Sequence, residues 1–501
     1  MTPSQHASPG TSPDISPGTS LNAARRARDL DHVAAEPVDL LVVGGGVTGA
    51  GVALDAASRG LSVCLVEAHD LAFGTSRWSS KLVHGGLRYL AQGEVGLAHE
   101  SAVERGILMT RTAPHLVRAL PQLVPLHDRS RSSVVMAGLR AGGALRHLAR
   151  TPAGVLPPPR RVPAAEALAL APGLRRAGLR GGLLSFDGQL VDDARLVIAL
   201  ARTAAGHGAR ILTRVRAVAL TGTGAQVVDT LTGESLDLRA RAVVNAAGVW
   251  AGDLVDVDLR PSRGSHLVLS ASTAGLTGTA LTVPVPGARN RFALLLPQHD
   301  DRVYVGLTDE PVTGPVPDVP TVPRSDVDFL LRVASSVLER PLSPADVLGA
   351  FAGLRPLLNG GGGPSADLSR RHAVLTSGNV TTVVGGKLTT YRRMAADAVD
   401  ATRLTTAPCR TATLPLVGAT PPTTPAPAHL VARYGGEAPR VAELGEVAWA
   451  VHHEGALTAD DILDRRTRIG LVPADRAAAE PAVTAQLTTL TTDHERRTHQ
   501  S

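Results

Sequence analysis

The sequence contains few aromatic residues and few cysteines. Phe, Trp and Tyr make up 2% of the 501 residues, so a large core must be filled mainly by Val, Leu and Ala. The spacing of the two cysteines, Cys64 and Cys409, matches no metal-ligand motif. Cys64 lies in an apolar segment, where a small buried thiol is expected. The scarcity of cysteine excludes a disulfide framework and fits a reducing, cytoplasmic compartment.

A hydrophobic run long enough to cross a membrane is also missing. The uncharged stretch at residues 267–288 is interrupted by Ser, Thr, Gly and two prolines. The N-terminus lacks the charged-then-apolar pattern of a secretory signal, so we expect none. Residues 1–20 are rich in Pro, Ser, Thr and Gly and predict a disordered tail. We extend this tail to residue 36, with a short basic helix at 23–30 that nothing else in the sequence requires.

Lysine is almost absent, although the chain is basic. The formal net charge is +6, and Lys81 and Lys387 are the only lysines among the 51 basic residues. Both lie in glycine-rich motifs, which indicates that a compact ammonium is needed there. An excess of positive charge can indicate binding to nucleic acid or anionic lipid. Because the arginines are spread along the chain without interleaved aromatics, we interpret the excess as a solvated surface with a few anion sites.

The chain is organised around a nucleotide-binding pattern at residues 39–67. Apolar runs at 39–43 and 62–66 predict buried strands, and the Ala-rich run at 50–59 predicts a helix between them. Four glycines at the turn allow close packing and close approach of a pyrophosphate: Gly44, Gly45, Gly46 and Gly49. Glu67 follows at the spacing of an acid that accepts a hydrogen bond from a ribose hydroxyl. The pattern predicts dinucleotide binding, with a ligand-free glycine-rich turn as the alternative, and does not separate FAD from NAD.

A second polar, glycine-rich segment follows at residues 74–90. Its hydroxyls, amides and cations suit a polar cofactor, and Arg88 has the forked geometry to bind an anion. A polar surface loop is the alternative. A third glycine-rich turn, Gly385–Gly386, precedes a predicted helix and directs unpaired N–H groups toward a ligand.

The remaining segments give the order of elements. Residues 115–180 predict an insertion of helices and turns, and Asp192 and Asp193 suit the start of a helix at 192–205. Apolar alternation predicts strands at 183–186, 189–191, 209–219, 225–230, 235–240, 241–245, 292–296 and 380–384. Helices are expected at 94–112, 326–338, 387–402, 441–453 and 458–469, and the chain ends in a charged tail.

Together these motifs resemble the FAD-dependent glycerol-3-phosphate dehydrogenase family. The resemblance covers about residues 39–472. It is carried by GGGVTGAG at 44–51, SSKLVHGGLRYL at 79–90, VDDARL at 191–196, NAAG at 245–248, GSH at 264–266, GLRPL at 353–357, GGKLTTYR at 385–392 and DRRTR at 464–468. Two departures are Leu307, where the family often has Thr, and Arg371, where it often has Asp.

The resemblance implies an α/β fold with three parts: an FAD/NAD(P)-binding Rossmann-like domain, a β-sheet substrate domain and a C-terminal α-helical domain. We divide the chain into a tail (1–36), three FAD-binding parts (37–114, 183–260 and 349–402), a substrate or cap insertion (115–182), a substrate domain (261–348), a linker (403–427) and the helical domain (428–501).

The resemblance also implies a function. FAD would accept a hydride from C2 of sn-glycerol 3-phosphate, giving dihydroxyacetone phosphate, and electrons would pass to a membrane quinone. The expected location is the cytoplasm, with peripheral attachment to the inner face of the cell membrane, and family members often form homodimers. The alternatives are a glycerol-3-phosphate oxidase that uses oxygen, another FAD-dependent oxidoreductase of the same fold, and a flavin-holding protein that binds nucleic acid. We expect neither a metal nor a nucleic-acid partner.

Matching the family motifs assigns candidate site residues. Catalytic roles fall to His266, Arg355 and Lys387, and substrate binding to Arg88, Tyr89 and Thr308. His266 suits a general base by residue type, with His84 as a rival and a hydrogen-bonded sheet histidine as the alternative. Arg88 and Arg355 suit a phosphate. The cofactor-binding candidates are Gly44, Gly45, Gly46, Gly49, Glu67, Thr75, Ser76, Ser80, Lys81, Gly248, Gly386, Leu388 and Thr389.

Overall fold

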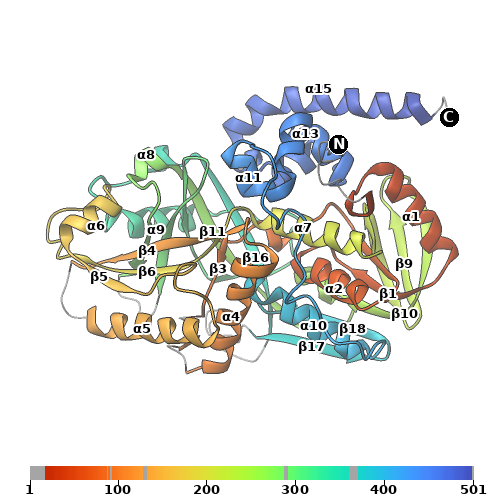
Figure 1. The fold of residues 1–501 in the computed structure, drawn as a ribbon, viewed down its shortest axis with the longest axis horizontal. Coiled ribbons are helices and arrows are strands. Elements are labelled where there is room, and N and C mark those ends of the chain that lie inside the picture. The colour runs from red at the N-terminus through yellow and green to blue at the C-terminus, as the bar shows by residue number, and fades with distance from the viewer. Residues whose placement is uncertain are drawn as a thin grey trace, which may run out of the picture.

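A mostly parallel sheet carries the glycine-rich turn after residue 43. The computed structural model describes residues 17–86, 89–90, 93–127, 132–286, 291–359 and 371–498. Its eight-stranded sheet has the order β17 (His372–Ser377), β18 (Val380–Gly385), β10 (Ser235–Asn245), β1 (Val38–Val43), β2 (Val63–Glu67) and β7 (Arg210–Thr213). An antiparallel ribbon of β8 (Val215–Thr221) and β9 (Gly224–Asp229) extends from β10. The sheet lies on the right of Figure 1.

Three helices cover one face of this sheet, and one helix together with the β8–β9 ribbon covers the opposite face. The helices α2 (Val47–Ser58), α7 (Asp193–Gly206) and α10 (Tyr391–Thr402) share a buried cluster with β1 and β2. On the opposite face, α1 (Ala23–Ala35) and the β8–β9 ribbon pack over Leu41 and Cys64. Coverage on both sides explains why β1 and β2 are nearly continuous apolar runs. It also explains why α1 packs on the domain and extends to residue 35, beyond the short helix predicted at 23–30 within the tail: Val33 is buried against the sheet.

The second sheet has ten strands, and many of them lie outside the predicted substrate domain. Its order is β15 (Glu310–Pro311), β11 (Leu259–Ser270), β14 (Arg302–Gly306), β13 (Phe292–Pro297), β12 (Ala280–Pro284), β4 (Val117–Pro125), β6 (Gly182–Leu190) and β3 (Leu82–Val83). β16 (Gly349–Leu358) pairs with β11, and β5 (Arg160–Val162) pairs with β6. Short helices on this side are α6 (Ala164–Leu170), α8 (Ala271–Ala274) and α9 (Arg324–Ser335).

These pairings correct three expectations. The segment at 115–182 is more than helices and turns, because it contributes the strands β4 and β5, with the long α5 (Ser132–Leu148) between them in the chain. Residues 182–190 form one strand instead of the two predicted at 183–186 and 189–191, because they pair with β4 without a break. The buried Asp187 carboxylate accepts hydrogen bonds from Arg105 and from the Gly85 and Gly188 amides. β16 pairs with β11 and belongs to the second sheet, which corrects the expected place of residues 349–358 in the FAD-binding domain.

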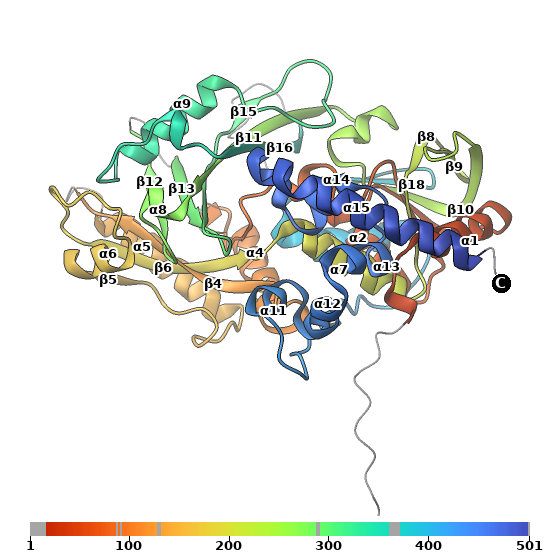
Figure 2. The same cartoon turned by 90° about the horizontal axis from the view of Figure 1, so that it is seen from above.

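The C-terminal region is helical, as predicted, and lies across the top of Figure 1 and in front in Figure 2. It contains α11 (Ala428–Tyr434), α12 (Ala438–Leu444), α13 (Glu446–His453), α14 (Ala459–Asp461) and α15 (Pro473–Thr498). The helix expected from residue 458 begins with a capping box, in which Thr458 and Asp461 each bond the other's backbone amide. The predicted charged tail is wrong: α15 continues to Thr498, and its Val483 is buried against α13 and α14. No helix in the described ranges is both long and apolar enough to cross a membrane.

A partly buried histidine makes the contact with the C-terminal region sensitive to pH. His115 packs against Gly418 and Gly435, and burial together with the charge of Arg195 lowers its pKa to about 4. Below pH 6.5 His115 is protonated in the unfolded chain but stays neutral in the folded protein until the pH nears 4. The free energy of unfolding therefore falls as the pH falls.

We expect His115 to account for about 2 kcal/mol of the stability lost between pH 7.5 and 5.0. In the variant His115→Gln, the free energy of unfolding measured with urea should differ between these two pH values by about 2 kcal/mol less than in the wild type. An equal pH dependence in both proteins would contradict the assignment.

Candidate active site

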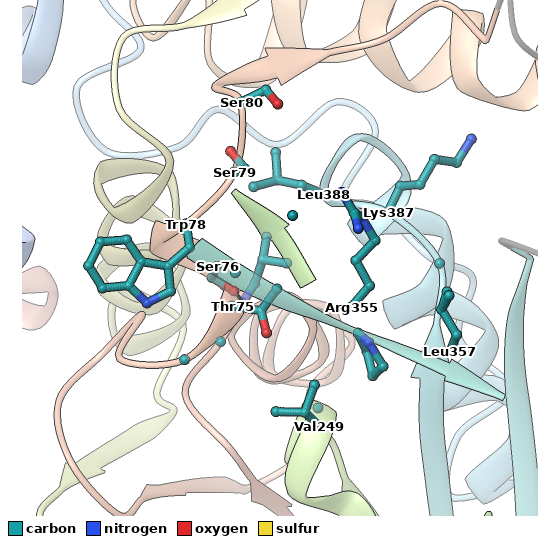
Figure 3. A pocket seen from close by; sticks show the side chains of 18 of the residues that line it. Thr75, Ser76, Trp78, Ser79, Ser80, Val249, Arg355, Leu357, Lys387 and Leu388 are labelled. Carbon is teal, nitrogen blue, oxygen red and sulfur yellow. Dashed lines mark hydrogen bonds between the residues drawn. The ribbon is translucent and has the colours of Figure 1, made fainter. Parts of the chain in front are cut away.

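A cavity of about 1730 Å³ lies where the carboxyl ends of β1 and β2 face the ten-stranded sheet. It extends from the turn before α2 to the turn before α10. Figure 3 shows the Thr75–Ser80 segment on one side and Arg355, Leu357 and Lys387 on the other. Ligands of open α/β sheets bind outside the carboxyl ends of the strands, so this position is the expected one.

The predicted nucleotide turn forms one end of the cavity. Gly44 has φ +108° and a Cβ there would meet the carbonyl of Ala246, while a Cβ on Gly49 would overlap the carbonyl oxygen of Gly44. The Gly45 amide donates to Glu67 Oε2 at 2.6 Å. Gly44, Gly46 and Glu67 line the cavity, whereas Gly45 and Gly49 shape the turn from behind. Burial raises the pKa of Glu67.

Hydroxyls of the second polar segment close this end. Ser76 Oγ accepts a hydrogen bond from the Val47 amide at 2.9 Å, and Thr75 Oγ1 donates to the carbonyl of Leu354 at 2.6 Å. Thr75, Ser76 and Ser80 line the cavity. Gly248, with φ +62°, lines it from the turn after β10.

The other end is the turn before α10. Gly385 and Gly386 have φ values of +73° and +71°, and Gly386, Lys387, Leu388 and Thr389 line the cavity. Thr389 Oγ1 accepts a hydrogen bond from the His84 amide at 3.0 Å. Lys387 Nζ donates to Ser101 Oγ at 2.6 Å and lies 4.0 Å from the centroid of the Tyr89 ring.

The residues present fit FAD. Gly46 leaves the backbone bare at the turn before α2, where a Cβ would lie 3.1 Å from Ser76 Oγ, and α2 begins without a side-chain cap. A pyrophosphate matches such an uncapped helix start. The cavity continues from this turn to a second glycine-rich turn before α10, which suits an elongated dinucleotide.

His266 lies on β11 at the cavity wall. Its Nε2 is 2.8 Å from Ser80 Oγ, its ring stacks on Phe351 with centroids 4.7 Å apart, and Nδ1 has no partner among the described residues. Burial, with the nearby charges of Lys81 and Arg355, lowers the pKa of His266 to about 3. The imidazole is therefore neutral at physiological pH.

Arg355 lies in the same sheet as His266, and Thr308 lies in the connection that follows β14, the strand paired with β11. Arg355 projects from β16 and is held by Asp309 at 3.2 Å, Ser262 Oγ at 3.3 Å and the Thr308 carbonyl at 3.2 Å. Gly264 leaves the space that the guanidinium occupies. Thr308 Oγ1 accepts from the Ser265 amide at 2.9 Å.

Two predicted site residues need separate mention. Lys81 does not line the cavity: its ammonium is buried and bonded to Asp193 Oδ2 at 2.8 Å, which corrects the expectation of a direct cofactor contact. Arg88 lies outside the described residues.

Sequence reasoning overlooked several residues that line the cavity. Asp187 lies 3.7 Å from His84 Nδ1, and Asp309 and Asp326 hold Arg355 and Arg263 respectively. The signal for Asp309 was its place directly after Thr308; nothing local pointed to Asp187 or Asp326, because their partners are far away in the sequence.

Comparison with known proteins identifies relatives over nearly the whole chain. The FAD dependent oxidoreductase family model matches residues 39–392. Glycerol-3-phosphate dehydrogenase 1 of Mycobacterium tuberculosis is 55% identical over 497 residues, covering 91% of this chain and 96% of that protein. Glycerol-3-phosphate dehydrogenase of Mycobacterium leprae is 36% identical, covering 92% of this chain and 86% of that protein.

Two solved structures of FAD-containing proteins are also similar to this chain. The glycerol-3-phosphate dehydrogenase of Bacillus halodurans complexed with FAD has a TM-score of 0.72 at 25% identity, covering 95% of this chain and 96% of that one. The L-alpha-glycerophosphate oxidase of Mycoplasma pneumoniae with FAD bound has a TM-score of 0.57 at 19% identity, covering 74% of this chain and 95% of that one, which shows a shared fold.

Proposed function

Because the chain belongs to the FAD-dependent glycerol-3-phosphate dehydrogenase family, within the FAD dependent oxidoreductases, we propose that it oxidises sn-glycerol 3-phosphate to dihydroxyacetone phosphate. The observation that carries the proposal is the 55% identity to a glycerol-3-phosphate dehydrogenase along 96% of that protein. The grouping of Arg355, His266 and Thr308 at one wall of the cavity supports it.

The chain's own residues supply binding and proton transfer. When bound, FAD supplies the acceptor for the C2 hydride. Arg355 offers a forked cation for the phosphate, and its contacts with Asp309 and Ser262 hold the fork in place. Lys387 lies at the turn before α10, where FAD would be held. Tyr89 lies beneath its ammonium.

His266 is our proposed acceptor of the C2 hydroxyl proton. It is neutral, so it can take a proton, and the negative charge of a bound phosphate would raise its pKa toward the working range. Ser80 Oγ orients its Nε2. His84, beside Asp187, is the second candidate because it is half exposed to the same cavity.

The test is an anaerobic titration of the purified holoenzyme with sn-glycerol 3-phosphate, following the oxidised flavin absorption band. Prompt loss of the band is expected. A flavin that stays oxidised would contradict the substrate, and a protein that cannot hold FAD would contradict the cofactor.

We propose a membrane quinone as the electron acceptor, reached through peripheral membrane attachment in the cytoplasm. The helix α5, at the lower left of Figure 1, supports this attachment. Its Val135 and Leu139 line the cavity, so a membrane bound at α5 would lie close to the proposed FAD site. Residues 132–165 include no acid, and Arg140, Arg150 and Leu148 are exposed, Leu148 to 64%. Basic and apolar groups together suit an anionic lipid surface. Oxygen consumption with peroxide formation at turnover rates would instead favour an oxidase.

Reversing charge on this face should weaken binding to vesicles. Each arginine near an anionic surface contributes about 1 kcal/mol, so the double variant Arg140→Glu/Arg150→Glu should lose at least about thirtyfold in affinity for phosphatidylglycerol-containing vesicles. The control Arg324→Glu/Arg440→Glu changes the same charge at exposed positions elsewhere. Equal losses in a co-sedimentation assay would contradict the role of α5.

A further inference from the structure

The C-terminal helices reach the segment that lines the cavity from behind. Three sequence motifs meet at this contact although they are far apart in the chain: residues 79–82, 191–196 and 464–468. None of their charged side chains lines the cavity, so the proposed chemistry does not account for them.

Arg468 joins these motifs. Its guanidinium donates to the carbonyl of Arg77 at 2.6 Å and lies 3.8 Å from Asp192 Oδ1 and 4.0 Å from Asp193 Oδ1. It lies 5.5 Å from the centroid of the Trp78 ring, and Trp78 lines the cavity. Arg468 is 8% exposed. A planar cation with several donors can hold these groups simultaneously.

Asp193 transmits this contact to the residues around Ser80. Its Oδ2 accepts from the Ser79 amide at 2.9 Å and from Lys81 Nζ at 2.8 Å. Lys81 Nζ also donates to the Arg77 carbonyl at 3.0 Å, the same oxygen that accepts from Arg468. The residues on both sides of Ser80 are therefore fixed by buried charges.

Ser80 in turn contacts His266, as described above. A second contact reaches the same histidine: Leu471 and Val472 pack with Phe351, on which the His266 ring stacks. A Cβ on Gly349 would overlap the Leu471 carbonyl oxygen, so the C-terminal segment and β16 approach closely. Both routes start in the C-terminal region and end at His266.

We propose that Arg468 is a positioning residue: by holding Arg77 and Asp193 it fixes Ser80, and through Ser80 the orientation of His266. The kinetic part of this inference rests on the proposed function. The structural part, that Arg468 orders residues 73–82, does not depend on it.

A conservative pair of variants separates positioning from general stabilisation. Arg468→Lys keeps the charge but loses the planar fork. Arg202→Lys is the matched control: Arg202 is also buried and joins the same C-terminal region through Glu437 at 2.6 and 2.7 Å, but it does not line the cavity or contact residues 73–82.

The first measurement is hydrogen exchange of the two holoenzymes, followed by mass spectrometry. We expect faster exchange in peptides covering residues 73–82 in Arg468→Lys and unchanged exchange there in Arg202→Lys. The second is the anaerobic rate of flavin reduction, which should fall about tenfold or more in Arg468→Lys, with little change in substrate affinity. Asp193→Asn, which removes the charge that bonds Ser79 and Lys81, should give the same pattern if Arg468→Lys folds poorly.

Unchanged exchange at residues 73–82 in Arg468→Lys and Asp193→Asn would overturn the proposal. So would equal changes in Arg202→Lys. If wild-type flavin is not reduced by sn-glycerol 3-phosphate, the proposed function fails, while the exchange result still decides whether Arg468 orders this segment.

Discussion

Replacing Arg355 with alanine should raise the sn-glycerol 3-phosphate concentration needed for half-maximal flavin reduction by about 30- to 5,000-fold. Losing a charge-assisted contact to a bound anion in a water-poor site typically costs 2–5 kcal/mol, which corresponds to this range. Arg355 is held by Asp309, Ser262 and Thr308, so its fork is arranged before the substrate arrives. The measurement is the anaerobic titration described above, repeated over a wide substrate range with FAD content checked first.

Two variants serve as controls for this result. Arg355→Lys keeps the charge but loses the forked guanidinium, so its substrate affinity should lie between those of the wild type and Arg355→Ala. Arg302→Ala removes another ion-paired arginine from the same sheet, bonded to Asp475 and outside the cavity lining, and should leave substrate affinity unchanged. An Arg355→Ala protein with wild-type affinity would contradict the phosphate role.

Replacing Gly49 with valine should abolish FAD retention. A Cβ at this position would overlap the carbonyl oxygen of Gly44, so α2 must move away from β1 or the turn must change shape. Overpacking of this kind costs about 1–3 kcal/mol of stability, and the displaced turn is the one that a pyrophosphate would contact. The purified variant should be colourless, and FAD titration into it should show affinity reduced by about 10²-fold or more.

A glycine without close neighbours gives the control. A Cβ on Gly96, in the helix α4 (Val95–Ile107), meets nothing within 4 Å, and its φ is not positive. Gly96→Ala should therefore retain FAD and stability. Normal FAD content in Gly49→Val would show that the turn tolerates the displacement.

The sequence predicted the elements whose causes are local. The strand–turn–helix–strand unit at 38–67 could be read from apolar runs and glycines, and the Asp192 cap from its position before α7. The strand pairing of β4, β6 and β16 could not, because it depends on partners more than fifty residues away.

Lys81 illustrates the same limit within the site. Its glycine-rich setting indicated a ligand contact, but its φ of +56° and the position of Asp193 turn the ammonium away from the cavity. The distant partner decided its place, and no local pattern contained that information.

The eight-stranded sheet is assembled from three separate stretches of chain, at residues 38–67, 210–245 and 372–385. Its first strands and the glycine-rich turn are synthesised early, but β18, which pairs with β10, is among the last strands. The residues at the nucleotide end of the cavity are therefore synthesised long before the residues of the turn that precedes α10. Such non-local pairing is intrinsically slow and leaves strand edges exposed during synthesis. Cofactor capture consequently belongs to the end of folding, when both ends of the cavity are present.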